Sequence, residues 1–534
     1  MRKPKKAGVW SIESIAPPTV QQLSLSYIIL PPFMSSQAVD YDALEASTSI
    51  EEITENEFYQ DTLRSLKNDD LPALFLCTQG AAVEGEGLGH ITFDSSRELD
   101  WLGHFARKST CLNEFGMYGM EIFDRCSGQS VDKFFENLGR CNHIEKMRFD
   151  DTDLAGLIYK LGPVMKNNNI TQWTSDGCFL GVPEAKFLFN TFRDMKSLGE
   201  LCISDDNRAV FDYLDDDVVA GCIPSLAACT GMWKLVLKDM LMSTQSCAAL
   251  GAIFPRMAAL LELNLGGNSI DDNSVDALVH GLADCKNLIS LKLSHNMIGD
   301  GGLDVLIQGL PATVGHLEIS YNEITFAREM PLLRFKTLHL SGNALSSDGA
   351  RVVAASLANP ECRLEKLNLA WTNVGDVEAA ILAPSLRSNQ RLAMMSLTAN
   401  SITETGWNAF SSVLCDTGSV NATHDSNHTL QALGYGRTIP QDIKMLLKLN
   451  HVTDKSRVAA NKILQFHRHL DMRPLFGWEF GLLPYVIAWL EFFADSRLDL
   501  KVSSIFEFVR AMPMKVTDRL GGKTKGKKRK LNSQ

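Results

Sequence analysis

The sequence predicts an α/β solenoid of about twelve repeats, in which a curved parallel β-sheet forms the concave face and helices form the convex face. Three observations support this prediction. The pattern LxxLxLxxNxI recurs along the chain, most copies follow one another at intervals of 26 to 29 residues, and the segments between copies have the apolar spacing of amphipathic helices. An interval of that length accommodates one strand, one turn and one helix.

The first element of each repeat is a short strand that ends in a turn. In the clearest copy, Leu260, Leu263 and Leu265 precede Asn268 and Ile270. Successive side chains of a strand point to opposite faces, so the leucines are expected in the core and the residues between them on the open face. The second leucine position recurs at residues 115, 147, 173, 201, 235, 263, 291, 317, 338, 367, 395 and 433, with the last copy degraded.

The second element is an outer helix. After Ile270, the apolar residues Val275, Leu278, Val279 and Leu282 have the spacing i, i+3, i+4, i+7 that places them on one face of a helix. A strand and a helix from one repeat cannot bury their apolar faces alone. Neighbouring repeats are therefore expected to stack around a shared core.

These residues and their spacing resemble the ribonuclease-inhibitor-like leucine-rich-repeat family, whose long repeats carry the same strand segment followed by an outer helix. The resemblance covers roughly residues 70 to 440. It implies a horseshoe-shaped solenoid. It implies little about function, because this repeat serves many unrelated recognition tasks.

The asparagine of the motif is expected to be structural. It lies where the chain leaves the strand, and its amide offers a donor and an acceptor to the backbone of a neighbouring coil. Threonine or cysteine can do only part of this, so coils that carry Thr152, Cys178 or Thr372 are expected to be held less rigidly. The asparagines assigned to this role are Asn268, Asn296, Asn322, Asn343 and Asn400.

One interval departs from the regular length. Only 21 residues separate Leu317 from Leu338, and Pro331 stands where a helix would run. We expect an extended or irregular outer segment there, with a local change in curvature.

The two ends of the chain differ from the solenoid at residues 66–440. Residues 1–65 lack the repeat and mix prolines with acidic runs, so this segment is expected to be partly disordered. Residues 441–515 are expected to form a helical cap over the last coil. Its apolar segment 481–493 is too short and too polar to span a membrane, so no membrane span is expected. Residues 516–534 are expected to be a disordered basic tail.

Composition narrows the function classes. The 534 residues are 45% hydrophobic and carry a formal net charge of −11, which argues against a large nucleic-acid surface outside the basic tail. The twelve cysteines form no CxxC pair, and we find no secretory signal sequence. We therefore expect a cytoplasmic protein. The KGKKRK cluster is consistent with a nuclear-import signal, with a tether to an anionic surface, or with a merely solubilising tail.

No enzyme signature is found in the sequence: phosphate loop, GxGxxG, HExxH and nucleophile elbow are all absent. The histidine pairs His424/His428 and His467/His469 lack companion ligands for a metal, so neither a metal nor a cofactor is expected. Function is therefore expected on the concave face. The residues predicted to bind a partner there are Tyr118, Lys146, Arg148, Asp176, Lys234, Lys238, Glu262, Asn264, Lys292, Glu318, His339 and Lys366, with Tyr321 and Trp371 as aromatic anchors at the rim.

A polar face of mixed charge suits a protein partner better than an apolar ligand or a small-molecule substrate. The leading hypothesis is a monomeric, non-catalytic scaffold for protein–protein interaction. Two alternatives are a regulator similar to the Ran GTPase-activating proteins and a nuclease inhibitor. The basic tail differs from the acidic tail typical of the first family, and the concave face has few aromatic residues for the second.

Overall fold

The computed structural model describes residues 40–78, 89–204, 214–327, 332–346, 348–435 and 439–467. The chain divides into two units, Met1–Thr48 and Ser49–Gln534. In the first unit the described part contains one short helix, α1 (Tyr41–Leu44). The second unit holds the repeats, and the sheet and helices described next all belong to it.

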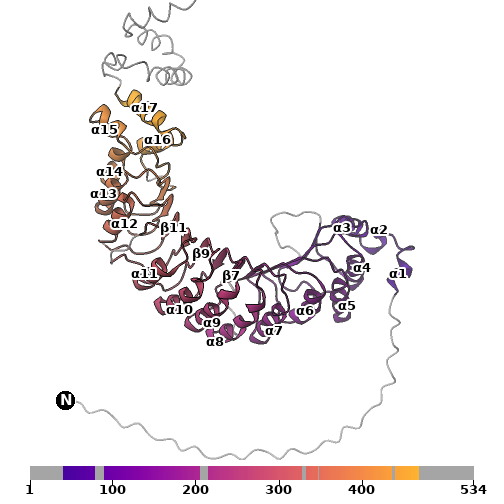
Figure 1. The fold of residues 1–534 in the computed structure, drawn as a ribbon. Helices are drawn as coiled ribbons and strands as arrows, with labels where there is room; N and C mark the ends of the chain where they lie inside the picture. The colour runs from indigo at the N-terminus through magenta and orange to yellow at the C-terminus, as the bar shows by residue number, and fades with distance from the viewer. Residues whose placement is uncertain are drawn as a thin grey trace, which may run out of the picture. The chain divides into compact units, whose positions relative to one another are not determined.

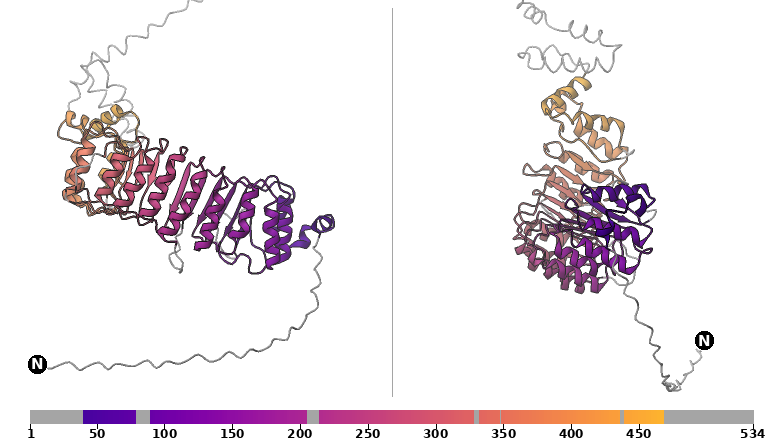
Figure 2. Two further views of the ribbon diagram at one scale, coloured as in Figure 1. Left: turned by 60° about the horizontal axis from the view of Figure 1, so that its bottom comes forward. Right: turned by 90° about the vertical axis from the view of Figure 1, so that its right-hand side faces the viewer.

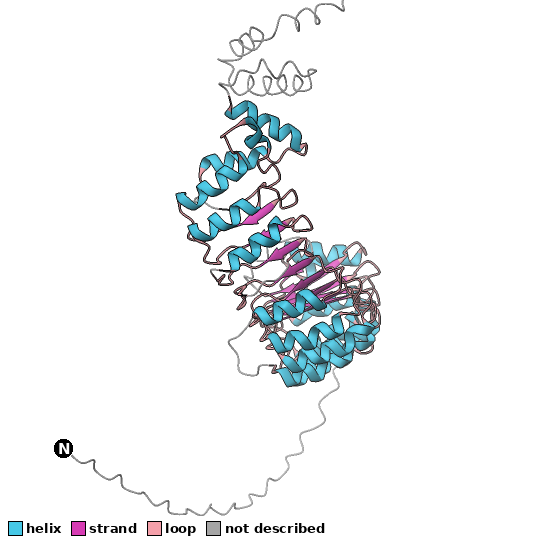
Figure 3. Cartoon of the chain, turned by 60° about the vertical axis from the view of Figure 1, so that its left-hand side comes forward, coloured by secondary structure: helices cyan, strands magenta, loops and turns pink. Residues whose placement is uncertain are grey.

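The second unit is built on one parallel sheet with the strand order β13-β12-β11-β10-β9-β8-β7-β6-β5-β4-β3-β1-β2. The sheet forms the inner side of a curved array, and the helices form a separate outer layer (Figures 1 and 3). The strands are β1 (Ala73–Cys77), β2 (His90–Ile91), β3 (Glu114–Tyr118), β4 (Lys146–Asp150), β5 (Gln172–Asp176), β6 (Glu200–Ser204), β7 (Lys234–Lys238), β8 (Glu262–Asn264), β9 (Ser290–Lys292), β10 (His316–Glu318), β11 (Thr337–His339), β12 (Lys366–Asn368) and β13 (Met394–Ser396).

The register confirms the repeat pattern. Leu235 lies opposite Leu263, and Leu263 lies opposite Leu291, so the second leucine positions of successive copies form a continuous row. These three side chains are 0% exposed. The degraded last copy is present as an isolated parallel bridge between Met394 and Ala432.

The outer layer contains the expected helices, stacked side by side along the array (Figure 2). In α10 the residues Val275, Leu278 and Leu282 are all fully buried, as their spacing predicts. The outer elements are α4 (Ser96–Ala106), α5 (Gly128–Leu138), α6 (Ile158–Asn167), α7 (Val182–Phe192), α8 (Asp216–Cys222), η1 (Ile223–Ala228), α9 (Thr244–Ile253), η2 (Phe254–Arg256), α10 (Asp272–Leu282), α11 (Asp300–Gly309), α12 (Gly349–Ala358), α13 (Asp376–Ser385) and α14 (Glu404–Leu414).

The motif asparagines link each coil to the one before it. The Asn268 carboxamide oxygen accepts hydrogen bonds from the backbone N–H groups of Met240 and Met242, at 3.0 and 3.1 Å. Its amide nitrogen donates to the carbonyls of Leu237 and Leu265, both at 2.9 Å. Asn296, Asn322, Asn343 and Asn400 repeat this arrangement, so the structural role expected of them is confirmed.

The substitutes for asparagine make fewer of these bonds. Thr372 donates only to the carbonyl of Leu369 in its own coil, at 2.7 Å. Thr152 does reach the preceding coil, where its hydroxyl donates to the Met117 carbonyl at 3.1 Å.

The short interval between β10 and β11 contains no helix in its described residues, as its length predicts. Two side chains tie this segment to the preceding coil. The Asp300 carboxylate accepts hydrogen bonds from the backbone N–H groups of Thr325, Phe326 and Ala327. The Arg334 guanidinium donates to carbonyls that follow or end α11, including Ile307 and Leu310 at 2.8 and 2.9 Å.

The N-terminal end of the sheet extends beyond the first copy found in the sequence. Leu71, Leu74 and Leu76 match the LxxLxL part of the motif and are buried around β1, which pairs with β3. Helices α2 (Ile50–Ile53) and α3 (Glu57–Lys67) precede this strand. The Tyr59 hydroxyl of α3 donates to the Glu98 carbonyl of α4 at 2.7 Å, so α3 packs on the solenoid.

The described C-terminal part ends in three helices, α15 (Val420–His424), α16 (Gln441–Leu449) and α17 (Lys455–Phe466). Lys462 of α17 is fully buried, and its ammonium donates to the carbonyls of Leu414 and Asn427 at 2.6 and 2.8 Å. The apolar segment 481–493, His469 and the basic tail lie outside the described residues. Among the residues that are described, no helix has both the length and the apolar character needed to cross a membrane.

Candidate functional site

The concave face consists of the strand residues on either side of each buried leucine. Residues before the leucine form one row across the sheet, in which Lys234 lies next to Glu200 on one side and Glu262 on the other. Residues after the leucine form a second row that runs Asn264, Lys292, Glu318, His339 and Asn368. The sequence therefore predicted correctly which residues share this face.

Several charges on this face are paired with each other. The Lys234 ammonium lies 2.6 Å from a Glu200 carboxylate oxygen, and the Lys292 ammonium lies 2.6 Å from Glu262. The hydrogen bond to Glu200 raises the pKa of Lys234. These lysines and Glu262 thus already have ionic partners within the protein, which the sequence did not reveal.

A hollow of about 650 Å³ lies over the central strands of this face. Glycine and serine residues follow the strands at its floor, and their small size leaves the space open. Its lining residues are Lys238, Asp239, Asn264, Gly266, Gly267, Lys292, Ser294, His295, Glu318, Ser320, Tyr321, His339, Ser341 and Asn368. This concave, mostly polar hollow has room for part of a partner and is therefore the candidate site on this face.

Hydroxyl groups form a chain across the floor of the hollow. The Ser341 hydroxyl donates to the Ser320 hydroxyl at 2.9 Å, and the Ser320 backbone N–H donates to the Ser294 hydroxyl at 3.2 Å. The Ser294 hydroxyl in turn donates to a Glu318 carboxylate oxygen at 3.2 Å. Close to Glu318, the rings of His316 and His339 stack with centroids 5.5 Å apart. Burial lowers the pKa of both histidines, which favours the neutral form of each ring.

The rim of the hollow carries aromatic side chains at turn positions with positive φ. Tyr321 (φ 53°) stacks on His295 (φ 56°) with ring centroids 4.5 Å apart. A Cβ atom on Gly342, one coil further on, would overlap the Tyr321 ring, so this ring packs against the neighbouring turns while remaining 45% exposed. Trp371 (φ 57°) is 63% exposed.

The predicted partner-binding residues fall into two groups. Lys238, Asn264, Lys292, Glu318, His339 and Tyr321 meet in the central hollow. The others lie outside its lining, namely Tyr118, Lys146, Arg148, Asp176, Lys234, Glu262, Lys366 and Trp371. At the N-terminal end, Arg148 lies over the ring of Tyr118 and pairs with Asp150 at 3.3 Å.

One surface was missed in the sequence. Trp233, Leu261 and Ile289 each occupy the position just before a strand. The backbone N–H of Leu261 donates to the Trp233 carbonyl, and that of Ile289 donates to the Leu261 carbonyl. They are 37%, 39% and 54% exposed and form an apolar lip along the strand-entry edge of β7, β8 and β9. The recurrence of large apolar residues two positions before the buried leucine was the available signal.

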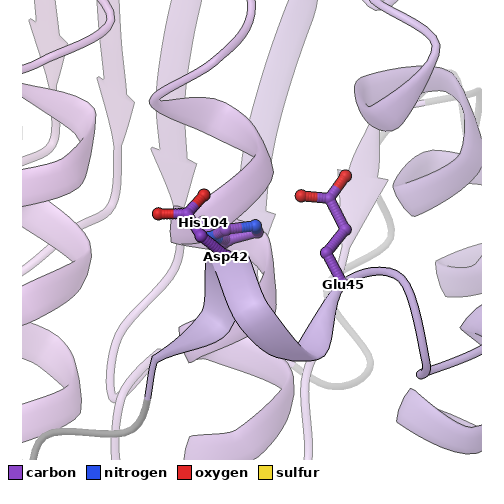
Figure 4. A group of neighbouring side chains, drawn as sticks. All are labelled: Asp42, Glu45 and His104. Carbon is purple, nitrogen blue, oxygen red and sulfur yellow. The ribbon is translucent and has the colours of Figure 1, made fainter.

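Side chains that could bind a metal ion together are rarely clustered in the described residues. One group of possible ligands contains Asp42 and Glu45, at α1, and His104 of α4 (Figure 4). α1 and α4 belong to different units of the chain, and no site is built from these three residues.

Comparisons with known proteins agree with the repeat architecture. A family model described as Leucine Rich repeat matches residues 259–279, 284–306 and 335–354. The ribonuclease inhibitor of Sus scrofa is 27% identical over 182 residues, which are 34% of this chain and 36% of that protein. The NACHT, LRR and PYD domains-containing protein 3 of Mus musculus is 27% identical over 229 residues, which are 43% of this chain and 20% of that protein.

Two solved structures of bacterial proteins are also similar. An internalin from Listeria monocytogenes str. 4b F2365 covers 73% of this chain and 98% of its own, with 15% identity and a TM-score of 0.37. A leucine-rich-repeat protein of Leptospira interrogans covers 65% of this chain and 94% of its own, with 14% identity and a TM-score of 0.34.

Proposed function

Because the chain is a ribonuclease-inhibitor-like leucine-rich-repeat protein, we propose that it is a non-catalytic scaffold that binds a protein partner on the concave face of its sheet. The observation that carries this proposal is the central hollow of about 650 Å³, which successive coils line with polar and charged side chains. Polar groups and charges of both signs, together with aromatic residues at the rim, are typical of protein interfaces.

The arrangement of the charges supports a recognition role. Lys234–Glu200 and Lys292–Glu262 link neighbouring strands while their side chains stay part-exposed. Because these charges lie on the open face, they are available to a partner as well as to the fold. A partner that meets them gains specificity from the pattern of charges.

An exchange of the two charges in one pair tests this proposal. The double variant Glu262→Lys, Lys292→Glu keeps an ion pair between β8 and β9 but reverses its direction on the concave face. Its control is Asp132→Lys, Lys160→Asp, which exchanges an ion pair between α5 and α6 on the convex side. Circular dichroism is expected to show that both variants remain folded.

The readout is quantitative affinity capture from cells with the tagged full chain. We expect proteins that bind wild type and the convex control equally to be lost from the concave variant. Equal capture of every protein by all three chains would contradict binding on the concave face.

The ribonuclease inhibitor among the relatives supports a second candidate, inhibition of a ribonuclease. The test is hydrolysis of RNA by a pancreatic-type ribonuclease with and without an excess of this chain. Unchanged hydrolysis would exclude this candidate for that enzyme. Stimulation of GTP hydrolysis, measured in parallel with the small GTPase Ran, tests the other alternative that the sequence raised.

A further inference from the structure

The central hollow contains one carboxylate that lacks an ionic partner. Four charged residues line it, and they are Lys238, Asp239, Lys292 and Glu318. Lys238 lies 3.6 Å from Asp239, and Lys292 is held at 2.6 Å by Glu262, which lies outside the lining. Across the described ranges, no cation lies within ion-pair distance of Glu318.

We propose that the hollow receives a basic side chain of the protein partner, an arginine, with Glu318 as its counter-ion and the His295–Tyr321 stack as one wall. This inference rests on the proposed function, because it specifies what the concave face recognises. A guanidinium is planar, offers five N–H donors and is always charged. It matches a site that combines a carboxylate with aromatic rings.

Hydrogen-bond acceptors are available around Glu318. The Glu318 carboxylate accepts only one hydrogen bond from a described side chain, that of Ser294, which leaves acceptor capacity on both oxygens. Ser320 and Ser341 lie in the same lining, but both are buried and their hydroxyls bond to each other, so Glu318 is the main acceptor. An arginine can therefore donate to both oxygens of the Glu318 carboxylate.

The wall of the hollow suits a planar cation. The His295 and Tyr321 rings are nearly parallel, with an angle of 11° between them. The coil before His295 carries Gly267 at the equivalent turn position, and the Asp239 carboxylate lies in the space that a side chain there would take. Arginine guanidinium groups stack on aromatic faces more readily than lysine ammonium groups do.

Glu262 has a specific part in this arrangement. Lys292 lies directly opposite Glu318 on the neighbouring strand, so it is the residue best placed to neutralise that carboxylate. Its ammonium is instead bound to Glu262. Glu262 thereby keeps Glu318 available, and we expect its removal to release Lys292 towards Glu318 and to close the site to a cation.

The experiment uses saturation-transfer difference NMR, which detects weak ligands of large proteins. The probes are N-acetyl-arginine amide and N-acetyl-glutamate amide, each added to the full chain. We expect saturation transfer to the arginine probe and at least about fivefold less to the glutamate probe, since an ion pair of this kind is worth about 1 kcal/mol.

Three variants locate the binding. Glu318→Gln is expected to reduce transfer to the arginine probe about fivefold. Glu262→Gln is expected to act in the same direction through Lys292. Glu365→Gln is the control, because Glu365 is exposed and lies outside the hollow. Unchanged transfer in Glu318→Gln or Glu262→Gln, or a preference for the glutamate probe, would overturn the proposal.

The two levels of proposal fail in different ways. If the arginine probe shows no saturation transfer while the charge exchange at Glu262 and Lys292 still abolishes capture of a partner, the concave face binds proteins but the hollow does not take an arginine. If the probe binds but the charge exchange leaves capture of every protein unchanged, the scaffold function fails while the local site stands.

Discussion

Replacing Asn268 with alanine tests the role of the asparagine rungs in holding the coils together. In the wild-type protein this side chain serves the backbone N–H groups of Met240 and Met242 and the carbonyls of Leu237 and Leu265. The Leu265 carbonyl keeps a second donor in the amide of Asn296. Alanine therefore leaves three of these four groups, the two N–H groups and the Leu237 carbonyl, without a side-chain partner.

The expected cost follows from these three groups. A buried backbone group that loses its partner costs about 1–3 kcal/mol. Asn268 is 7% exposed, so water can compensate only in part, and we expect the lower range of the sum, about 3–5 kcal/mol. This is a large share of the free energy of unfolding of an ordinary domain.

Urea denaturation followed by far-UV circular dichroism measures this loss. The control is Ser269→Ala, because the Ser269 side chain makes no hydrogen bond among the described residues and should change the free energy of unfolding by less than about 0.5 kcal/mol. A loss below about 1 kcal/mol in Asn268→Ala would refute the reasoning, since it would show that the rungs are not needed to satisfy the buried backbone.

Three further predictions concern single side chains. Thr372→Asn should raise the free energy of unfolding by about 1 kcal/mol in urea titrations, because it restores bonds to the preceding coil; a loss of stability would contradict it. Trp371→Gly should raise thermal stability by up to about 1 kcal/mol by removing a bulky residue from positive φ, yet weaken partner capture; unchanged capture would exclude Trp371 from the interface. Burial lowers the pKa of Lys462 to about 7. Between about pH 7 and about pH 10.4 the unfolded chain therefore binds more protons than the folded chain does. We therefore expect the free energy of unfolding of the wild type to rise with pH in this window relative to that of Lys462→Met, as measured by melting curves at each pH. The same pH dependence in both proteins would contradict this.

Much of the fold was predictable because the buried positions repeat. A leucine at every second residue followed by asparagine leaves little choice of register, and each predicted anchor from Phe115 to Met395 lies in a strand. β1 was missed because Leu74 lies 41 residues before the next anchor, Phe115, and so falls outside the regular spacing that links most of the other copies. β2 contains only two residues and offers no pattern to detect.

The site was less predictable than the fold. The alternation of a strand decides that Lys292 faces the concave side, but it does not decide whether its ammonium reaches Glu262 or Glu318. That choice depends on side-chain rotamers and on the distance between neighbouring strands, and neither can be predicted from the sequence. The conformation of the turn residues was also not predictable from the sequence, because only the backbone of the structure shows that Tyr321 and Trp371 lie at positive φ.

Positive φ couples the side chains of the rim to the stability of the fold. Leucines in the strands are fully buried whatever stands beside them, so substitutions between the leucines leave the core intact. At the turn position, every side chain costs roughly 1 kcal/mol relative to glycine, and Gly267 and Gly342 show that this chain uses glycine at equivalent turns. Tyr321 recovers part of that cost by packing against His295 and Gly342. Trp371, 63% exposed, recovers little of it by burial, and we predict that this side chain contacts a partner.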